Sequence, residues 1–156
     1  IENGLYVHDD SLDILKIAVV ERHHKTGNVG LGFLEGYGLK NGAVAMTIAH
    51  DSHNLILIGD NDADMFTALE EIDRIQGGIV LVQNGEVVDS LQLEFGGIMT
   101  NKDVSVVESK IKNMDSILRD MGVNEKVDDP FLSLAFMSLP VIPEIKLTDK
   151  GLFDVG

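Results

Sequence analysis

The sequence predicts a single domain of the α/β or α+β class, in which a mixed β-sheet with hairpins is flanked by helices. Three observations support this prediction. The length of 156 residues is that of one domain with one main core. Short runs rich in β-branched residues alternate with segments of helical periodicity. The dipeptide Asn84 and Gly85 stands between two apolar runs, which is a strong signal for a two-residue hairpin turn.

The first half of the chain predicts mainly strands. Residues 12–22 combine alternation with β-branched side chains and are expected to form the first strand. Residues 23–42 are rich in glycine, and each glycine in an exposed helix costs about 1 kcal/mol relative to Ala. A helix is nevertheless expected over residues 29–39, on condition that close packing compensates. Residues 43–50 and 54–59 are predicted to be two buried strands that form a hairpin or a sharp bend.

A helix is predicted between residues 61 and 76. Asp60 or Asn61 can cap its N-terminus, because either side chain can accept a hydrogen bond from a free backbone N–H of the first turn. Two glycines, at positions 77 and 78, supply a stop signal. The expected buried face consists of Met65, Leu69, Ile72 and Ile75.

The second half predicts a hairpin, a long helix and an extended tail. Two strands are expected in residues 78–93, on either side of the Asn-Gly turn. A helix with a charged outer face is predicted over residues 103–121. Residues 129–155 contain all three prolines and are expected to form a short strand, an extended proline segment and a terminal arm. The apolar stripe expected on the helix consists of Val106, Val107, Ile111, Met114, Ile117, Leu118 and Met121.

Charge and composition exclude several classes of partner. The 26 acidic and 12 basic residues give a formal net charge of −14, which argues against binding to nucleic acid or to an anionic membrane. No apolar run approaches the roughly 18 residues of a membrane helix, so a soluble globular domain is expected. The absence of cysteine excludes disulfides, thiolate nucleophiles and Cys-ligated zinc. The chain starts with Ile and has no secretory signal, so we expect it to begin within a longer protein.

Polar residues with catalytic potential gather at two predicted strand ends. Loops at strand ends often carry functional side chains on a rigid scaffold. The alternative is structural, with the first histidine pair exposed in a loop and the second hydrogen-bonded inside a turn. The first group consists of His23, His24, Thr26, Gly27 and Asn28, and the second of His50, Asp51, Ser52, His53 and Asn54.

Local motifs at these positions do not identify a metal site or a cofactor site. His50 and His53 could bind one metal only if the peptide turns, because in a strand they would face opposite sides. The sequence contains neither H-x-H nor H-E-x-x-H. Ser52 beside Asp51 suggests a hydrolase triad, but no G-x-S-x-G elbow surrounds it. We therefore predict no metal ligand and no cofactor-binding residue in this chain.

Three blocks together resemble one family: RHHKTGNVGLGFLEGYGLKNGAVAMTIAHDSHNLILIGDNDADM, GGIVLVQNGEV and LSLAFMSLPVIPEIKLTDKGLFDV. They look like the C-terminal domain of bacterial and archaeal adenine deaminases, which are members of the amidohydrolase superfamily. The resemblance extends from about residue 22 to residue 155.

The resemblance implies hydrolysis of adenine to hypoxanthine and ammonia in purine salvage. A divalent metal (manganese, iron or zinc) would activate the water, held in a preceding barrel domain that this chain lacks. It further implies a cytoplasmic homo-oligomer in which this domain packs on its own barrel and is inactive alone. The candidate residues at the edge of the substrate pocket are His50, Asp51, His53, Ser52, His23, His24 and Asn28.

Two other functions are left open by the sequence. The first is a structural or oligomerisation module, in which the apolar residues of segment 129–143 pack against the barrel or a sister subunit. In that case the histidines would only satisfy turns. The second is an independent module that binds a small molecule or a metal.

Overall fold

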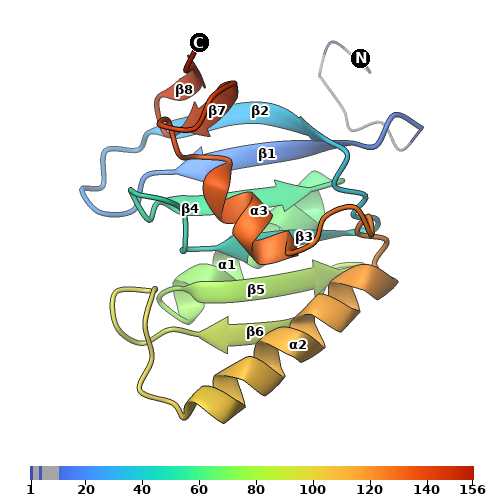
Figure 1. Ribbon diagram of the computed structural model, residues 1–156, viewed down its shortest axis with the longest axis vertical. Coiled ribbons are helices and arrows are strands. Elements are labelled where there is room, and N and C mark those ends of the chain that lie inside the picture. The colour runs from blue at the N-terminus through green and yellow to red at the C-terminus, as the bar shows by residue number, and fades with distance from the viewer. Residues whose placement is uncertain (2–3, 5–10) are drawn as a thin grey trace.

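The computed structural model describes residues 1, 4 and 11–156 (Figure 1). Within this part of the chain, strands outnumber helices in both halves. The elements in order are β1 (Ile14–Val20), β2 (Val29–Glu35), β3 (Gly42–Met46), β4 (Leu55–Gly59), α1 (Asp62–Arg74), β5 (Gly78–Gln83), β6 (Glu86–Gln92), α2 (Val104–Asp120), α3 (Pro130–Phe136), β7 (Ile145–Thr148) and β8 (Gly151–Asp154).

The main sheet of the described residues has the strand order β2-β1-β4-β3-β5-β6. Every adjacent pair in it is antiparallel, so none of the parallel pairs of a mixed sheet occurs among these strands. Helix α1 covers one face, and α2 and α3 lie on the other (Figure 1). The predicted combination of hairpins and flanking helices is therefore confirmed, in its α+β form. No helix in the described part of the chain is long and apolar enough to cross a membrane.

The central strands are buried on both faces, which explains their nearly continuous apolar sequences. Along β3, Ala43 and Ala45 face the core under α1, whereas Val44 and Met46 face the core under α2 and α3. Small alanines on the first side let α1 approach the sheet closely. Alternation along a single strand thus separates two apolar cores.

Two local predictions are confirmed in detail. Asn61 is the N-cap of α1, and its side-chain oxygen accepts a hydrogen bond of 2.8 Å from the N–H of Asp64. Asn84 and Gly85 join β5 to β6 with φ angles of 51° and 83°, as a type I′ turn requires.

The predicted buried stripe of α2 is confirmed only in its C-terminal half. Met114 and Leu118 are fully buried, and Met121 follows them into the core. Val106 and Ile111 are 56% and 36% exposed. The N-terminal half of α2 extends past the edge strand β6, so the sheet does not cover its apolar side chains (Figure 1). Sequence periodicity alone could not reveal this.

The helix expected over residues 29–39 is wrong, because residues 29–35 form strand β2. Val29, Leu31 and Phe33 are exposed on one face and alternate with Gly30 and Gly32 on the other. This period of two is that of a strand. Gly30 is needed for packing, because a Cβ atom there would lie 1.8 Å from the carbonyl oxygen of Thr148. It allows the β7–β8 hairpin to lie directly on β2.

The tail also differs from the expected strand and arm. Pro130 starts helix α3 instead of preventing it, because a proline at the first helical position lacks only an N–H that would be unpaired there. Asp129 caps this helix by accepting a hydrogen bond of 2.9 Å from the N–H of Leu132. After the remaining prolines, β7 and β8 form an antiparallel hairpin in place of a single strand.

We predict that Gly30→Ala lowers the free energy of unfolding by about 1–3 kcal/mol, because the added methyl group collides with backbone that cannot rotate away. Gly32→Ala is the matched control in the same strand, since its added Cβ would meet only side-chain atoms, the nearest at 3.5 Å. It should change the value by about 0.5 kcal/mol or less. Urea unfolding measures both, and equal effects of the two substitutions would contradict the proposed packing of the hairpin.

Candidate functional site

The two histidine-bearing segments lie side by side at the end of the sheet where β1 ends and β4 begins (Figure 1). Val20 at the end of β1 pairs with Leu55 at the start of β4, so loops 21–28 and 47–54 leave the sheet together. The ring nitrogen Nε2 of His23 is 2.7 Å from the carbonyl oxygen of Ser52. We call the following side chains the polar edge: His23, His24, Asn28, His50, Asp51, Ser52 and His53.

Arg22 joins three loops at the polar edge. Its Nε donates a hydrogen bond of 2.6 Å to the carbonyl oxygen of His53. Its Nη2 donates one of 2.7 Å to the carbonyl oxygen of Gly96, in the loop that follows β6. Burial lowers the pKa of Arg22, but an arginine still carries its charge at neutral pH. Sequence reasoning overlooked this residue, although it is a basic side chain at a strand end of a very acidic chain.

Glu21 organises the first loop through its carboxylate. It accepts hydrogen bonds from the backbone N–H groups of His23 at 2.5 Å, His24 at 2.7 Å and Thr26 at 3.0 Å. These bonds, that of Thr26 first, lower the pKa of Glu21 to about 2. The carboxylate is therefore ionised at neutral pH and holds the loop that carries the histidine pair. Sequence reasoning missed Glu21 because its role depends on a tight turn of the backbone.

Helix α3 supports the second loop. The ring of His50 stacks on that of Phe136, with centroids 5.1 Å apart and an angle of 23° between the planes. The N–H of His50 donates to the carbonyl oxygen of Ala135 at 3.0 Å, and Ser138 Oγ donates to the carbonyl oxygen of His50 at 3.3 Å. The His50–Asp51 peptide bond is cis. The C-terminal part of the chain thus contributes directly to the position of His50.

His53 and Asn54 carry buried polar atoms with unused hydrogen-bonding capacity. His53 Nδ1 and Asn54 Oδ1 have no hydrogen-bond partner within the described part of the chain. The pKa of His53 is lowered, by burial first and then by the charges of His50 and Arg22. Its imidazole is therefore neutral at pH 7. A neutral ring nitrogen of this kind can donate or accept a hydrogen bond, depending on the tautomer.

The remaining polar-edge residues are exposed. Asp51 is 83% exposed at its side chain, and its Oδ1 lies 3.8 Å from Nδ1 of His50. Ser52 Oγ accepts a bond of 3.3 Å from the N–H of Asn54, which indicates a turn rather than a hydrolase triad. Asn28 Nδ2 donates at 3.3 Å to Asp149, in the turn between β7 and β8.

These residues do not fit a metal ion. Among the described residues, no group of three or more His, Asp or Glu side chains is placed to hold one. His8 lies outside the described residues. The histidines come in two pairs, His23 with His24 and His50 with His53, with ring centroids 6.3 Å and 5.8 Å apart. We therefore assign no metal-dependent step to the polar edge.

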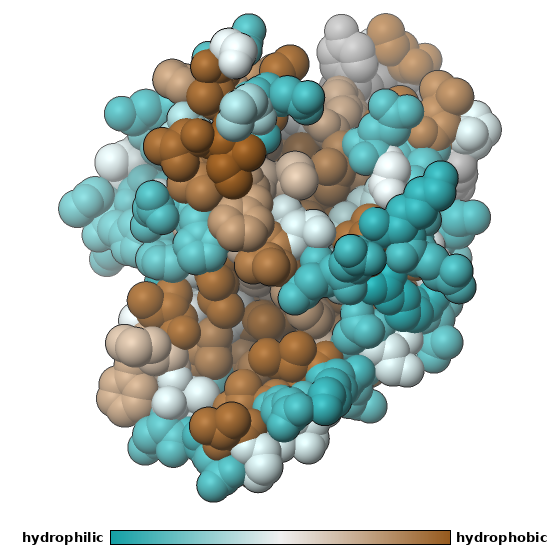
Figure 2. Space-filling view, viewed as in Figure 1, coloured by the Kyte–Doolittle hydropathy of each residue, from teal (hydrophilic) through white to brown (hydrophobic). Residues whose placement is uncertain are grey.

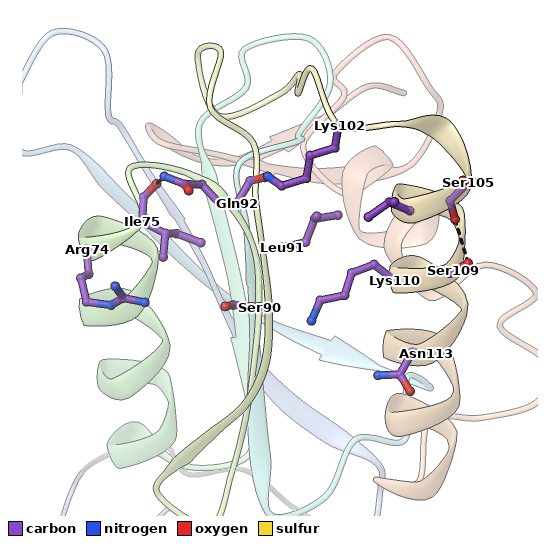
Figure 3. Close-up of a pocket in the computed structure, with 11 residues that line it drawn as sticks. Arg74, Ile75, Ser90, Leu91, Gln92, Lys102, Ser105, Ser109, Lys110 and Asn113 are labelled. Atoms are coloured by element: carbon purple, nitrogen blue, oxygen red, sulfur yellow. Dashed lines mark hydrogen bonds between the residues drawn. The ribbon is translucent and has the colours of Figure 1, made fainter.

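A separate groove of about 880 Å³ lies between the end of α1, β6 and the N-terminal half of α2 (Figure 3). Lys110 and Asn113 extend from α2 toward β6, and Arg74 lies on the α1 side. Arg74 is paired with Glu71, Lys102 with Glu94, and Lys110 with Asp89. Because these cations are already neutralised by the chain's own acids, the groove is a weaker candidate for binding an anion than its basic lining suggests.

We predict that Arg22→Met lowers the free energy of unfolding by about 2 kcal/mol, because two bonds from a charged group to backbone carbonyls are lost. Arg74→Met is the matched control. The side chain of Arg74 is 70% exposed and bonds that of Glu71, which is 12% exposed, one turn earlier on the same helix, so its loss should cost about 1 kcal/mol or less. Urea unfolding compares the two variants, and NMR spectra should show new motion in residues 50–54 for Arg22→Met alone.

We predict that Glu21 makes the free energy of unfolding of this domain sensitive to acid. Its pKa in the folded protein, about 2, lies below the ordinary value of 4.5, so the ionised carboxylate stabilises the fold fully above pH 4.5. That contribution should decline as the pH falls from 4.5 toward 2. The difference in unfolding free energy between the native chain and Glu21→Gln should therefore be constant near neutral pH and shrink in this acid range. An NMR titration of Glu21 with a midpoint near 4.5 would contradict the hydrogen-bonded loop.

Comparison with known proteins identifies the family. A family model described as the adenine deaminase C-terminal domain matches residues 1–156. The adenine deaminase of Clostridium acetobutylicum is 47% identical over 156 residues, which are 99% of this chain and 27% of that protein. Adenine deaminase 2 of Carboxydothermus hydrogenoformans is 49% identical over all of this chain and 27% of its own length. The adenine deaminase of Nitratidesulfovibrio vulgaris is 49% identical over 98% of the chain and 26% of its length.

The chain therefore spans about a quarter of the length of the curated relatives that it matches. The resemblance found in the sequence is confirmed over the entire chain. The chain belongs to the family of adenine deaminase C-terminal domains.

Proposed function

We propose that this domain serves a full-length adenine deaminase by forming one wall of its active site. The polar edge would face the catalytic domain, close the adenine pocket and exclude water from it. His50, Asp51 and His53 are the first candidates for this contact, followed by His23 and His24. None of them is assigned a proton-transfer role.

The observation that carries the proposal is the pair of unbonded atoms in the second loop. Buried polar atoms in folded proteins are normally hydrogen-bonded, so Nδ1 of His53 and Oδ1 of Asn54 leave the second loop with hydrogen-bonding capacity that a small adjustment could direct toward another group. The bonds from Arg22 hold this loop in place before that group arrives. A rigid polar loop suits recognition, because less ordering is required on binding.

The remaining chemistry would lie in the catalytic domain. That domain would hold the divalent metal, whether manganese, iron or zinc, and the metal would supply an activated water for hydrolysis of adenine to hypoxanthine and ammonia. In this chain, the polar edge would orient and enclose the substrate. A homo-oligomeric assembly and a cytoplasmic location stay predictions from the sequence.

The alternative function, as a module that packs through segment 129–143, has less support. Phe131, Leu134 and Leu139 from this segment are 8%, 1% and 8% exposed, because they fill the core of the same domain. Leu132, Val141 and Ile142 do remain exposed. The apolar side chains of the segment are therefore divided between the core of this domain and its surface, and only the second group can contact another surface.

We predict that His53→Ala and Asp51→Asn, made in the full-length enzyme, each lower kcat for adenine by roughly 10- to 100-fold, since small displacements at a reacting centre cost about that much. Asp73→Asn is the control, because Asp73 is exposed on α1, on the opposite face of the sheet from α3. Steady-state kinetics should be compared with metal content and unfolding midpoints. Unchanged kinetics in both site variants would contradict the proposal that the polar edge forms part of the active site.

We also predict that the chain by itself does not deaminate adenine, even when supplied with manganese, iron or zinc. No metal-binding group of three or more His, Asp or Glu occurs among its described residues to activate water. The measurement is ammonia release from adenine by the purified domain. Turnover at a rate comparable with that of a full-length enzyme would contradict the proposal that the catalytic metal lies in another domain.

A further inference from the structure

Among the described residues, helix α1 leaves part of its sheet face uncovered. It packs over β3, β4 and β5, whereas β1 and β2 continue beyond it (Figure 1). A helix about 10 Å wide covers roughly two strands that are about 4.8 Å apart, so there is room for a second helix beside α1. At this place the structure has a groove of about 690 Å³, which we call the β2–α1 groove.

The β2–α1 groove is lined mainly by apolar side chains. Leu31 is 71% exposed and Phe66 is 65% exposed, and Val29 and Phe33 are about half exposed beside them. Large contiguous apolar areas on a protein surface usually mark a binding site. The polar side chains at its margin, Lys16 and Asp62, are already paired at 2.6 Å.

The two edges of the main sheet differ in protection. Among the described residues, β6 has an extra residue, Val88, where its register against β5 shifts, and Lys102 and Lys110 lie beside it. Bulges and lysines are common protection against unwanted pairing. Strand β2 pairs with β1 at seven consecutive positions without a shift and contains no lysine. Strand β2 therefore lacks the bulge and the lysines that protect β6.

The position of the groove indicates what covers it. The family match is to a C-terminal domain that spans about a quarter of the relatives, so most of the polypeptide in those proteins precedes it. The chain enters β1 at Ile14, opposite Glu35, at one end of the β1–β2 pair. The polar edge begins at the other end, beyond Val20 and Val29. A preceding domain that contacts both ends of the strand pair would extend along it for about 20 Å.

Charge argues against a second copy as the occupant. Two chains with a formal net charge of −14 each repel one another, and neither brings basic residues to the groove beyond the paired Lys16. A segment of the same polypeptide does not need to overcome this repulsion in a separate association step.

We propose that the β2–α1 groove is the docking surface for the preceding domain of the same polypeptide, which inserts an amphipathic helix beside α1. This proposal rests on the proposed function only in taking the polar edge as the place that the preceding domain reaches. The apolar face of the inserted helix covers Leu31 and Phe66, and docking there holds the polar edge against the catalytic domain.

The test uses the full-length protein with a specific protease site introduced immediately before Ile1. Leu31→Glu and Phe66→Glu each place a charge in the groove, where burial without a partner is costly. Leu152→Glu is the matched control, because Leu152 is also a strand leucine and is 67% exposed, but it lies on the β7–β8 hairpin. After cleavage, gel filtration shows whether the two parts remain together, and light scattering of the uncut protein gives the number of subunits.

We expect the cleaved native protein and Leu152→Glu to remain associated, and Leu31→Glu and Phe66→Glu to separate with unchanged circular dichroism. Because two positions are tested, misfolding of one variant leaves the other decisive. Three outcomes would overturn the proposal. The first is separation in Leu152→Glu but not in the groove variants, the second is continued association of both groove variants, and the third is separation of the two parts of the native protein. A loss of subunits from the uncut groove variants would assign the groove to a second copy and overturn it as well.

The failure of this proposal can be distinguished from the failure of the proposed function. If the His53 and Asp51 variants keep full activity while the groove variants separate, the active-site role fails and the docking surface stands. If the groove variants stay associated while the site variants lose activity, the reverse holds.

Discussion

The antiparallel pairing of β1 with β4 is the contact on which the candidate site depends. It joins the β1–β2 and β3–β4 pairs into one sheet and brings loops 21–28 and 47–54 to the same edge. Both strands are apolar and largely buried. A slip of one residue would exchange the side chains that face α1 with those that face α2 and α3, so the two cores hold the register. The position of the histidines is thus a consequence of core packing.

Hydrogen bonds to backbone groups hold the polar edge. Glu21 and Arg22 are consecutive and their side chains serve different loops, the acid in its own loop and the base in the neighbouring one. Arg22 bonds carbonyl oxygens rather than a carboxylate. The result is a shaped loop that presents a neutral His53 in a chain of strongly acidic composition. Interactions of this kind depend less on salt concentration than exposed ion pairs do.

Strand β2 connects the packing of the domain with its exposed surface. On one face its glycines accept the β7–β8 hairpin, while on the other face Leu31 and its neighbours line the groove beside α1. The space-filling view from the side of α2 shows further apolar side chains over the hairpin and a hydrophilic outer surface on α2 (Figure 2). Val141, Ile145 and Leu152 account for exposed apolar surface in the tail. Among the described residues, exposed apolar side chains therefore lie on both sides of β2.

The sequence by itself determined the elements whose signals are local. Residues close together in the chain determine the Asn84-Gly85 turn, the cap and apolar spacing of α1, and the buried strands β3 and β4. The family resemblance was also carried by short stretches of sequence. Tertiary structure decided the rest. Residues 29–35 form a strand that pairs with β1 along its whole length, and only the fold shows that Gly30 leaves room there for a hairpin more than 110 residues away. Glu21, Arg22 and the β2–α1 groove acquire their roles only when distant loops meet, because hydrogen bonds and uncovered surface depend on spatial neighbours that no local pattern encodes.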